Sequence, residues 1–234
     1  MRSKMKVIFL FILVAMTVTT SAFAQGAVFG FMAGPSLSNQ KVNGFQREPF
    51  VRYHGLIFLE SSSEISPNSL YASLGYHIKG SAVNVLRYYD TDNIEHPGSS
   101  YSMEFHNLSL SIGVKQRREF GEKHFSYGFG LRGDYNIKGK FGYLFSGLEG
   151  AQNKITYGVD VNGGIELPLS ELVSVILELG ISPDLSEQLF VPQQNTGYTY
   201  SDGSPVILPE TKLTNVVFEA RAGFRFWHKV IYTD

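Results

Sequence analysis

The sequence predicts an all-β protein, an eight-stranded antiparallel up-and-down transmembrane β-barrel with short periplasmic turns and long extracellular loops. Three observations predict this fold. Apolar and polar residues alternate with a period of two along eight segments of the chain. These segments are about 10–13 residues long, which suits tilted membrane-crossing strands better than soluble strands of about five or six. The connections between the segments are alternately long and short.

The first segment, 1–24, is expected to be a secretory signal peptide rather than part of the barrel. A basic start, an apolar run over 7–18 and the small-residue site Ala22-Phe23-Ala24 are the three parts of such a peptide. The apolar run is too short for a transmembrane helix, which needs about 20 residues. The barrel domain is therefore expected over 25–234. The chain has no cysteine, so disulfide bonds cannot support the fold.

The first four predicted strands are the less regular half of the barrel. In 50–60 the polar face is interrupted by Leu56 and Phe58, which makes this the weakest of the eight. The apolar faces are Phe29, Phe31, Ala33 and Leu37 in 27–37; Val51, Tyr53, Ile57 and Leu59 in 50–60; Leu70, Ala72, Leu74, Tyr76 and Ile78 in 69–79; and Leu108, Leu110, Ile112 and Val114 in 105–115.

The last four predicted strands alternate more cleanly. Glycine, serine and charged residues fill the positions between their apolar residues, so one face of each strand is polar throughout. The apolar faces are Phe125, Tyr127, Phe129, Leu131 and Tyr135 in 125–135; Ile155, Tyr157, Val159, Val161, Ile165 and Leu167 in 155–167; Val173, Val175, Leu177, Leu179 and Ile181 in 172–182; and Val216, Phe218, Ala220, Ala222, Phe224 and Phe226 in 214–226.

The connections predict which rim of the barrel faces outward. Outer-membrane barrels have short periplasmic turns and long external loops. The shortest connection, at Pro168-Leu169-Ser170, is therefore expected on the periplasmic side, together with both ends of the barrel domain. The long external loops are predicted over 38–49, 80–104, 136–154 and 183–213, which contain many serine and asparagine residues.

A closed sheet is required because an unpaired backbone group in lipid costs several kcal/mol. The apolar faces then meet lipid, and the charged faces are enclosed in a lumen that eight strands just fill. Enclosed charges must be paired. Both signs occur on the polar faces, which favours a structural ion-pair network over a ligand or proton pathway. The candidates for this network are Arg132, Asp160, Glu178, Glu219, Arg221 and Arg225. Glu219 and Arg221 lie next to each other on one face of their strand and are expected to form a cluster in the middle of the lumen with Arg132, Asp160 and Glu178.

No catalytic, cofactor or metal motif accompanies this pattern. The sequence contains no G-x-S-x-G, no H-E-x-x-H and no P-loop. Its six histidines are not spaced as metal ligands, so each is interpreted as structural or superficial. His106, Ser109 and Ser111 lie close together but fit a loop boundary and lumen polarity better than a catalytic group. We therefore expect no enzyme, no cofactor and no metal.

The chain resembles the outer-membrane β-barrel domain family of gliding-type bacteria, often called PorT-like. The resemblance begins with Gly30, Gly34 and Ser38 in the first strand and continues at the strand that ends in Lys79-Gly80. It recurs in 157–167 and in the closing strand, and it covers nearly all of the expected barrel domain. The resemblance implies an outer-membrane location and no defined catalytic residue. One namesake is linked to protein secretion.

These observations predict a barrel with a structural or interaction role, whose long loops bind an unknown external ligand or protein. Outer-membrane lipid and the barrel insertion machinery are its other expected partners. Two alternatives stay open: a soluble periplasmic or extracellular barrel that binds an apolar ligand, and a barrel enzyme that modifies lipids. The soluble binder needs its apolar faces inside. The net charge of −1 gives no support for a nucleic-acid partner.

Overall fold

A computed structural model describes the chain from residue 27 to residue 228, apart from short gaps. The predicted signal peptide, 1–24, lies outside the described residues. The last described strand ends at His228, so strand structure continues past Phe226. The gaps are residues 43–46, 62–66, 86, 90–93, 122, 200 and 202.

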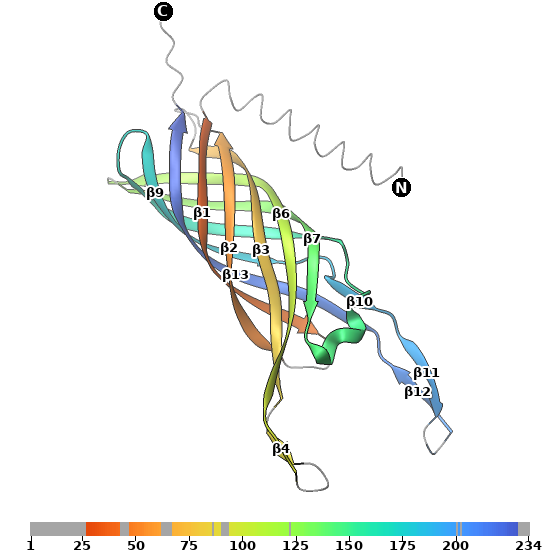
Figure 1. The fold of residues 1–234 in the computed structure, drawn as a ribbon. Helices are drawn as coiled ribbons and strands as arrows, with labels where there is room; N and C mark the ends of the chain where they lie inside the picture. Colours follow the sequence, from red (N-terminus) through yellow and green to blue (C-terminus); the bar gives the residue numbers. More distant parts are fainter. Residues whose placement is uncertain are drawn as a thin grey trace, which may run out of the picture.

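Eight long antiparallel strands form a closed barrel, which confirms the predicted fold class (Figure 1). Each strand pairs with its neighbour in the ring, and the pairing of the last strand with the first closes the sheet. The strands, in ring order, are β1 (Ala27–Val42), β2 (Glu48–Ser61), β3 (Asn68–Val85), β6 (Ser99–Phe120), β7 (Lys123–Phe141), β8 (Ile155–Pro168), β9 (Val173–Pro183) and β13 (Thr211–His228).

Smaller elements gather at the end of the barrel that carries the long connections, which we name the loop end (Figure 1). The opposite end, where short turns join β6 to β7 and β8 to β9, is named the turn end. No helix in the described part of the chain is long and apolar enough to cross a membrane. The smaller elements are β4 (Tyr88–Tyr89), β5 (Glu95–His96), the 3-10 helix η1 (Tyr143–Leu148), β10 (Leu189–Val191), β11 (Gln194–Thr199) and β12 (Pro205–Leu208).

The strands extend further into the predicted loops than the sequence indicated. β3 and β6 stay paired from Asn68↔Gln116 to Val85↔Ser99, so much of the predicted loop 80–104 is a projecting β-hairpin. Most of the predicted loop 38–49 is likewise strand. Serine and asparagine in these segments were interpreted as loop signals, but an antiparallel pair satisfies its backbone whatever its side chains are.

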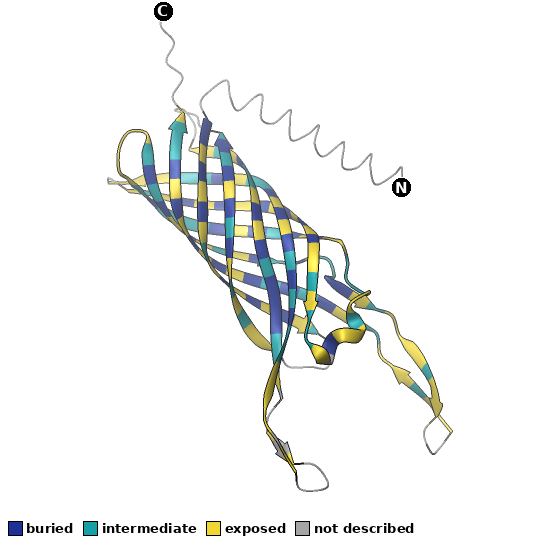
Figure 2. Cartoon of the chain, viewed as in Figure 1, coloured by how far each residue is buried: buried dark blue, intermediate teal, exposed yellow. Residues whose placement is uncertain are grey.

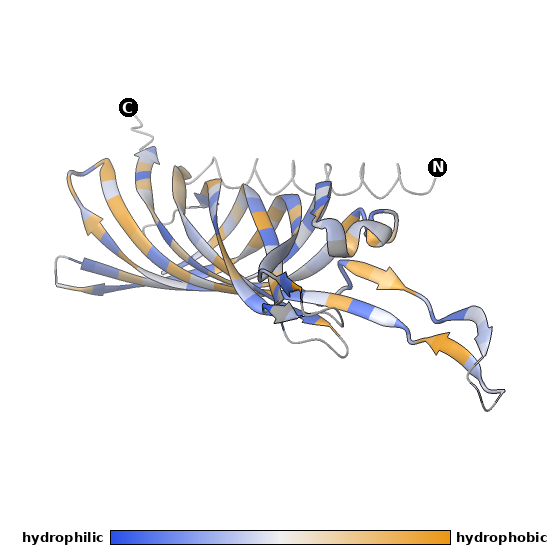
Figure 3. Ribbon diagram, turned by 60° about the horizontal axis from the view of Figure 1, so that its bottom comes forward, coloured by the Kyte–Doolittle hydropathy of each residue, from blue (hydrophilic) through white to orange (hydrophobic). Residues whose placement is uncertain are grey.

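Burial alternates along every strand of the ring (Figure 2). In β7, Tyr127, Phe129 and Leu131 face outward and are each more than half exposed, whereas Ser126 and Arg132 on either side of this run are buried. Hydropathy follows the same alternation along the strands (Figure 3). The predicted orientation is confirmed, because apolar side chains cover the outside of the barrel and charged side chains fill its lumen.

Candidate functional site: the filled lumen

A charge cluster occupies the middle of the lumen around Arg221 of β13. Its guanidinium contacts Asp160 of β8 at 3.1 Å and Glu178 of β9 at 2.7 Å, and it also donates to Glu219. Lys115 of β6 donates to the same Glu178 at 2.8 Å. All five side chains are buried. Asp160 accepts further hydrogen bonds from Tyr71, Asn162 and Ser182.

A second cluster lies on the loop side of the first. Lys79 of β3 contacts Asp134 at 2.5 Å and Asp184 at 2.8 Å. Arg132 of β7 donates to the same two carboxylates. Two cations and two anions therefore alternate in a closed square. The remaining acceptor capacity is used by Ser109, which donates to Asp134, and by Asn215, which donates to Asp184.

A third cluster closes the turn end of the lumen. Arg225 contacts both Glu60 and Glu166 at 3.2 Å. Arg117 contacts the same two carboxylates at 3.1 and 3.3 Å. Both guanidinium groups also lie against the ring of Trp227, at 5.1 Å for Arg117 and 4.8 Å for Arg225. The indole therefore covers the square of charges on one side.

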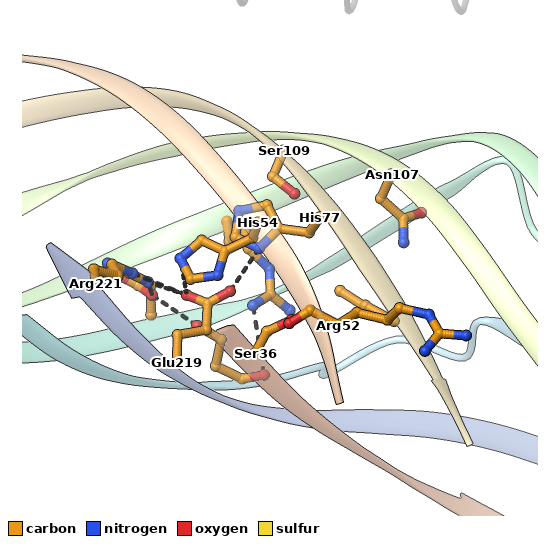
Figure 4. Close-up of polar contacts among 12 residues, drawn as sticks. Ser36, Arg52, His54, His77, Asn107, Ser109, Glu219 and Arg221 are labelled. Atoms are coloured by element: carbon orange, nitrogen blue, oxygen red, sulfur yellow. Dashed lines mark hydrogen bonds and ion pairs between the residues drawn. The ribbon is translucent and has the colours of Figure 1, made fainter. Parts of the chain in front are cut away.

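Two histidines lie beside the middle cluster (Figure 4). The rings of His54 in β2 and His77 in β3 are stacked, with centroids 5.1 Å apart. His77 Nδ1 lies 2.6 Å from Glu219 Oε1, and His54 Nε2 lies 4.0 Å from Glu219 Oε2. Spacing along the chain gives no sign of this pair, because it arises from adjacent strands. Both rings are buried, and the His77 ring lies within hydrogen-bond distance of the Glu219 carboxylate.

The lumen also contains an apolar patch, which the ion-pair interpretation did not foresee. Leu56 and Phe58 interrupt the polar face of β2 and are nevertheless buried inside. They pack against Met32 of β1 and Ile176 of β9, on the turn side of the histidines. Gly30 and Gly75 leave the space that these side chains occupy, because a Cβ atom at Gly30 would collide with the Phe58 ring and one at Gly75 would press against Leu56. The weak alternation of this strand therefore reflects lumen packing rather than doubtful strand structure.

The space that is left in the middle of the lumen is small. A cavity of about 20 Å³ lies among the apolar patch, Tyr71 and the ends of Lys115 and Arg221. A cavity needs roughly 10–15 Å³ to hold one water molecule, so this one suits a single water. The clusters thus fill the lumen as side chains fill a protein core.

The loop end of the lumen is closed by a layer in which one arginine is held by uncharged side chains. Arg47 donates to Gln40 Oε1 at 3.1 Å and to Ser81 Oγ at 2.9 Å, and it lies 4.9 Å from the ring of Phe145 in η1. Burial lowers the pKa of the Arg47 guanidinium below its ordinary value. The helix η1 and the segment near Leu189 pack over this layer. The buried apolar residues of this cap are Met103, Phe105, Phe145, Leu189 and Leu213.

The structure brings four of the six predicted lumen residues together. Asp160, Glu178, Glu219 and Arg221 form the middle cluster, as the sequence analysis proposed. It also placed Arg132 there, but this arginine pairs instead in the neighbouring loop-side cluster. The sixth candidate, Arg225, forms its ion pairs in the cluster at the turn end. Further lumen residues that form ion pairs, beyond the six candidates, are Glu60, Lys79, Lys115, Arg117, Asp134, Glu166 and Asp184.

Asp184 was missed because it lies two positions beyond the predicted strand, in the predicted loop 183–213. The signal was present, since Glu178, Gly180 and Ser182 continue with the same parity to Asp184. Arg117 follows Lys115 in the same way at the opposite end. In the described part of the chain, no three potential metal-ligating side chains form a group that could hold a metal ion.

The fold is that of eight-stranded outer-membrane β-barrels. The outer membrane protein OprG from Pseudomonas aeruginosa matches with a TM-score of 0.51 and 8% identity, over 88% of this chain and 98% of that chain. The Neisserial surface protein NspA matches with a TM-score of 0.44 and 9% identity, over 86% of this chain and 99% of its own. Such low identities describe a shared fold only. No family model and no curated protein matches the chain, and the PorT-like resemblance stays a prediction.

Proposed function

We propose that this protein is an outer-membrane barrel with a structural or interaction role, whose loop end forms the external binding surface. One observation carries the proposal: part of the way along the strands the outer face of the barrel changes from apolar to polar, and along β6 the inner face changes in the opposite sense. The packed lumen supports a role that does not depend on passage through the barrel. The PorT-like resemblance agrees with this location.

The exchange is clearest along β6. On the turn side its outward residues include Val114, Leu110 and Leu108, and its inward residues are polar. Beyond Leu108 the outward residues become polar, beginning with His106 and Glu104. The inward residues become apolar at the same level, at Phe105 and Met103, and both are fully buried. The outer surroundings of this strand therefore change from apolar to aqueous near His106.

The outward side chains of other strands change from apolar to polar at the same level of the barrel. The registers Ile78↔His106 and His106↔Lys138 connect the change in β6 to positions on β3 and β7. Beyond this level the polar residues on the outward faces are Asn39 and Lys41 in β1, Asn84 in β3, Lys138 and Lys140 in β7, and Lys212 and Thr214 in β13. A membrane surface at this level accounts for the change in every one of these strands, since only there does the solvent change from hydrocarbon to water.

The exposed apolar belt argues against the soluble alternative. Soluble monomers rarely expose contiguous apolar patches above a few hundred Å². Here Phe29 stacks on Phe226 and Phe31 lies tilted against Phe224 on the outer wall. Phe29, Phe31 and Phe224 are each at least 40% exposed. A soluble barrel would need these rings inside. The apolar inner patch of Met32, Ile176 and their neighbours is too small and too tightly packed to hold an apolar ligand.

Cell fractionation tests the proposed location. We expect the protein in the outer-membrane fraction, extractable only with detergent, and we expect its gel mobility to change on heating because the closed barrel resists unfolding. The loop-end elements β11 and β12 project from the barrel and are the first regions to probe for an external partner. Recovery from the periplasm without detergent would overturn the proposal and restore the soluble alternative.

A further inference from the structure

We propose that the outer wall of β6 and β7 carries a binding site for the phosphate groups of anionic membrane lipids, formed by Lys138 and Lys140 with Arg52 beside them. The inference rests on the membrane location proposed above and adds the headgroup chemistry that the barrel recognises. Its basis is a group of cations at one level of the wall, two of which have no protein partner.

The two lysines lie next to each other on the outside of the barrel. Register places Lys138 opposite His106 and Lys140 opposite Glu104. Directly opposed side chains on one face have Cβ atoms about 4.5–5.5 Å apart. Both lysines are exposed, and neither side chain forms an ion pair or hydrogen bond with any residue that the structure describes. Their charge is therefore available to a ligand outside the protein.

A β-bulge directs these lysines outward. The pairing of β6 with β7 passes from Asn107↔Asn136 to His106↔Lys138, which leaves Ile137 as an extra residue in β7. Asp134 and Asn136 face the lumen, so an unbroken alternation would carry positions 138 and 140 into the lumen as well. An extra residue reverses the parity beyond it and re-aims the side chains. The outward position of both cations thus depends on this one irregularity.

Arg52 neutralises the nearest carboxylate. Its Nη2 donates to Glu104 Oε1 at 2.9 Å, and its guanidinium lies 3.6 Å from the Phe50 ring centroid. Gly80 stands opposite Glu104 in β3 and leaves no side chain in the way. Figure 4 shows Arg52 extending away from the buried histidines. With Glu104 paired, the two lysines leave this part of the wall with a positive excess.

The position of these cations along the barrel axis matches that of lipid phosphate groups. The cations begin where the apolar belt ends, at Tyr76, Leu108 and Tyr135, and the Tyr76 hydroxyl lies 2.5 Å from His106 Nδ1. Tyrosines at such a border occupy the headgroup region of a bilayer. Cations just beyond it attract anionic lipids, an attraction that added salt screens. The exposed charges at the turn end are mixed, with Arg118 and Lys123 accompanied by acidic neighbours, and give no such excess.

Lipid retention by the folded protein tests this site. The protein is refolded in uncharged maltoside micelles and titrated with phosphatidylglycerol, phosphatidylcholine or inorganic phosphate, and bound ligands are counted by native mass spectrometry. We expect phosphatidylglycerol to be retained in preference to the other two. The double variant Lys138→Gln/Lys140→Gln should lose about tenfold in phosphatidylglycerol affinity. The control Arg118→Gln/Lys123→Gln removes the same charge from the turn end and should keep the preference.

Three outcomes would overturn the inference: equal retention of both lipids, equal losses in the two double variants, or inorganic phosphate binding as tightly as phosphatidylglycerol. The last result would indicate a site for free anions rather than for a lipid. Insertion into phosphatidylcholine vesicles is measured in parallel by the heat-dependent gel shift. Insertion without a lipid preference refutes only this site, whereas failure to insert refutes the membrane location on which it rests.

Discussion

The turn-side and loop-side parts of the barrel use the same alternation with opposite meanings. Along β6, Ser109 and Ser111 face a charged lumen while Leu108 and Leu110 face outward. A few residues closer to the loop end, Phe105 faces an apolar interior while Glu104 faces outward. The strand, its pairing and its period do not change between the two parts. Only the direction in which apolar side chains escape water changes, so the surroundings and not the fold decide which face is the core.

The two parts also differ in how their interiors are held together. The turn-side lumen depends on buried ion pairs, whose loss leaves charges without partners. Beyond the loop-side cluster of Lys79 and Arg132, the interior depends on the apolar cap formed by Phe145, Leu189 and their neighbours, like the core of a soluble domain. The ion pairs of Lys212 with Glu210 and of Arg87 with Glu95 lie at the loop end in contact with water. Substitutions of one chemical type should therefore have different effects in the two parts.

The largest effect is expected from Arg221→Met in the middle lumen. The change deletes the cation shared by Asp160, Glu178 and Glu219 and leaves their carboxylates buried together. Breaking a buried pair by removing one partner costs about 3–5 kcal/mol. We expect a loss of this size in the free energy of unfolding, measured by urea titration of the barrel in vesicles. A loss below about 1 kcal/mol would mean that the lumen is hydrated and its charges are screened.

A smaller loss is expected from Val161→Arg on the outer wall of β8. Val161 is exposed, but in the proposed orientation it faces hydrocarbon, where an arginine costs about 2–4 kcal/mol near the midplane. The matched change Ser100→Arg introduces the same side chain at an exposed position on the loop side of β6. There the surroundings are water, and the change should stay within about 0.5 kcal/mol. Equal urea stabilities for the two variants would refute the proposed boundary between them.

The sequence predicted the strands, and it predicted which side chains of each strand point outward, because both follow from local alternation. It also predicted that Glu219 and Arg221 share one cluster, since residues two apart in a strand lie on one face. It could not predict that Arg132 pairs one layer away, because that depends on the stagger between strands distant in the chain. Nor could it predict the parity change at Ile137, because a bulge is a property of a strand pair and not of one strand.

The loop end was interpreted as four loops for a related reason. A pattern of apolar residues establishes alternation but not the solvent on either side. In the segment before Phe105, serine and asparagine face outward to water, and the sequence analysis took them as loop polarity. With the membrane boundary near His106, the same residues become the ordinary polar face of a soluble hairpin. An explicit search for a reversal of the apolar face along one strand would have found it.

The smallest effect is expected from Lys212→Gln at the loop end. Lys212 Nζ lies 2.5 Å from Glu210 Oε1 and 3.8 Å from Glu187 Oε1, yet Lys212 is exposed and both carboxylate side chains are at least 35% accessible to solvent. The neighbouring Glu210 carboxylate raises the pKa of Lys212 above its ordinary value of 10.5. A raised pKa means that any contribution of the pair is present at neutral pH and disappears only as the pH rises through that raised value.

Water screens such an exposed pair, so the urea stability of this variant at pH 7 should match that of the unaltered protein within error. Arg221→Met provides the contrast, because it removes a cation from the same strand, β13, on the other side of the proposed boundary. A loss for Lys212→Gln comparable to that for Arg221→Met would mean that the loop end excludes water as the lumen does. The loop-side part would then belong to the same enclosed interior, and the boundary near His106 would have to move outward.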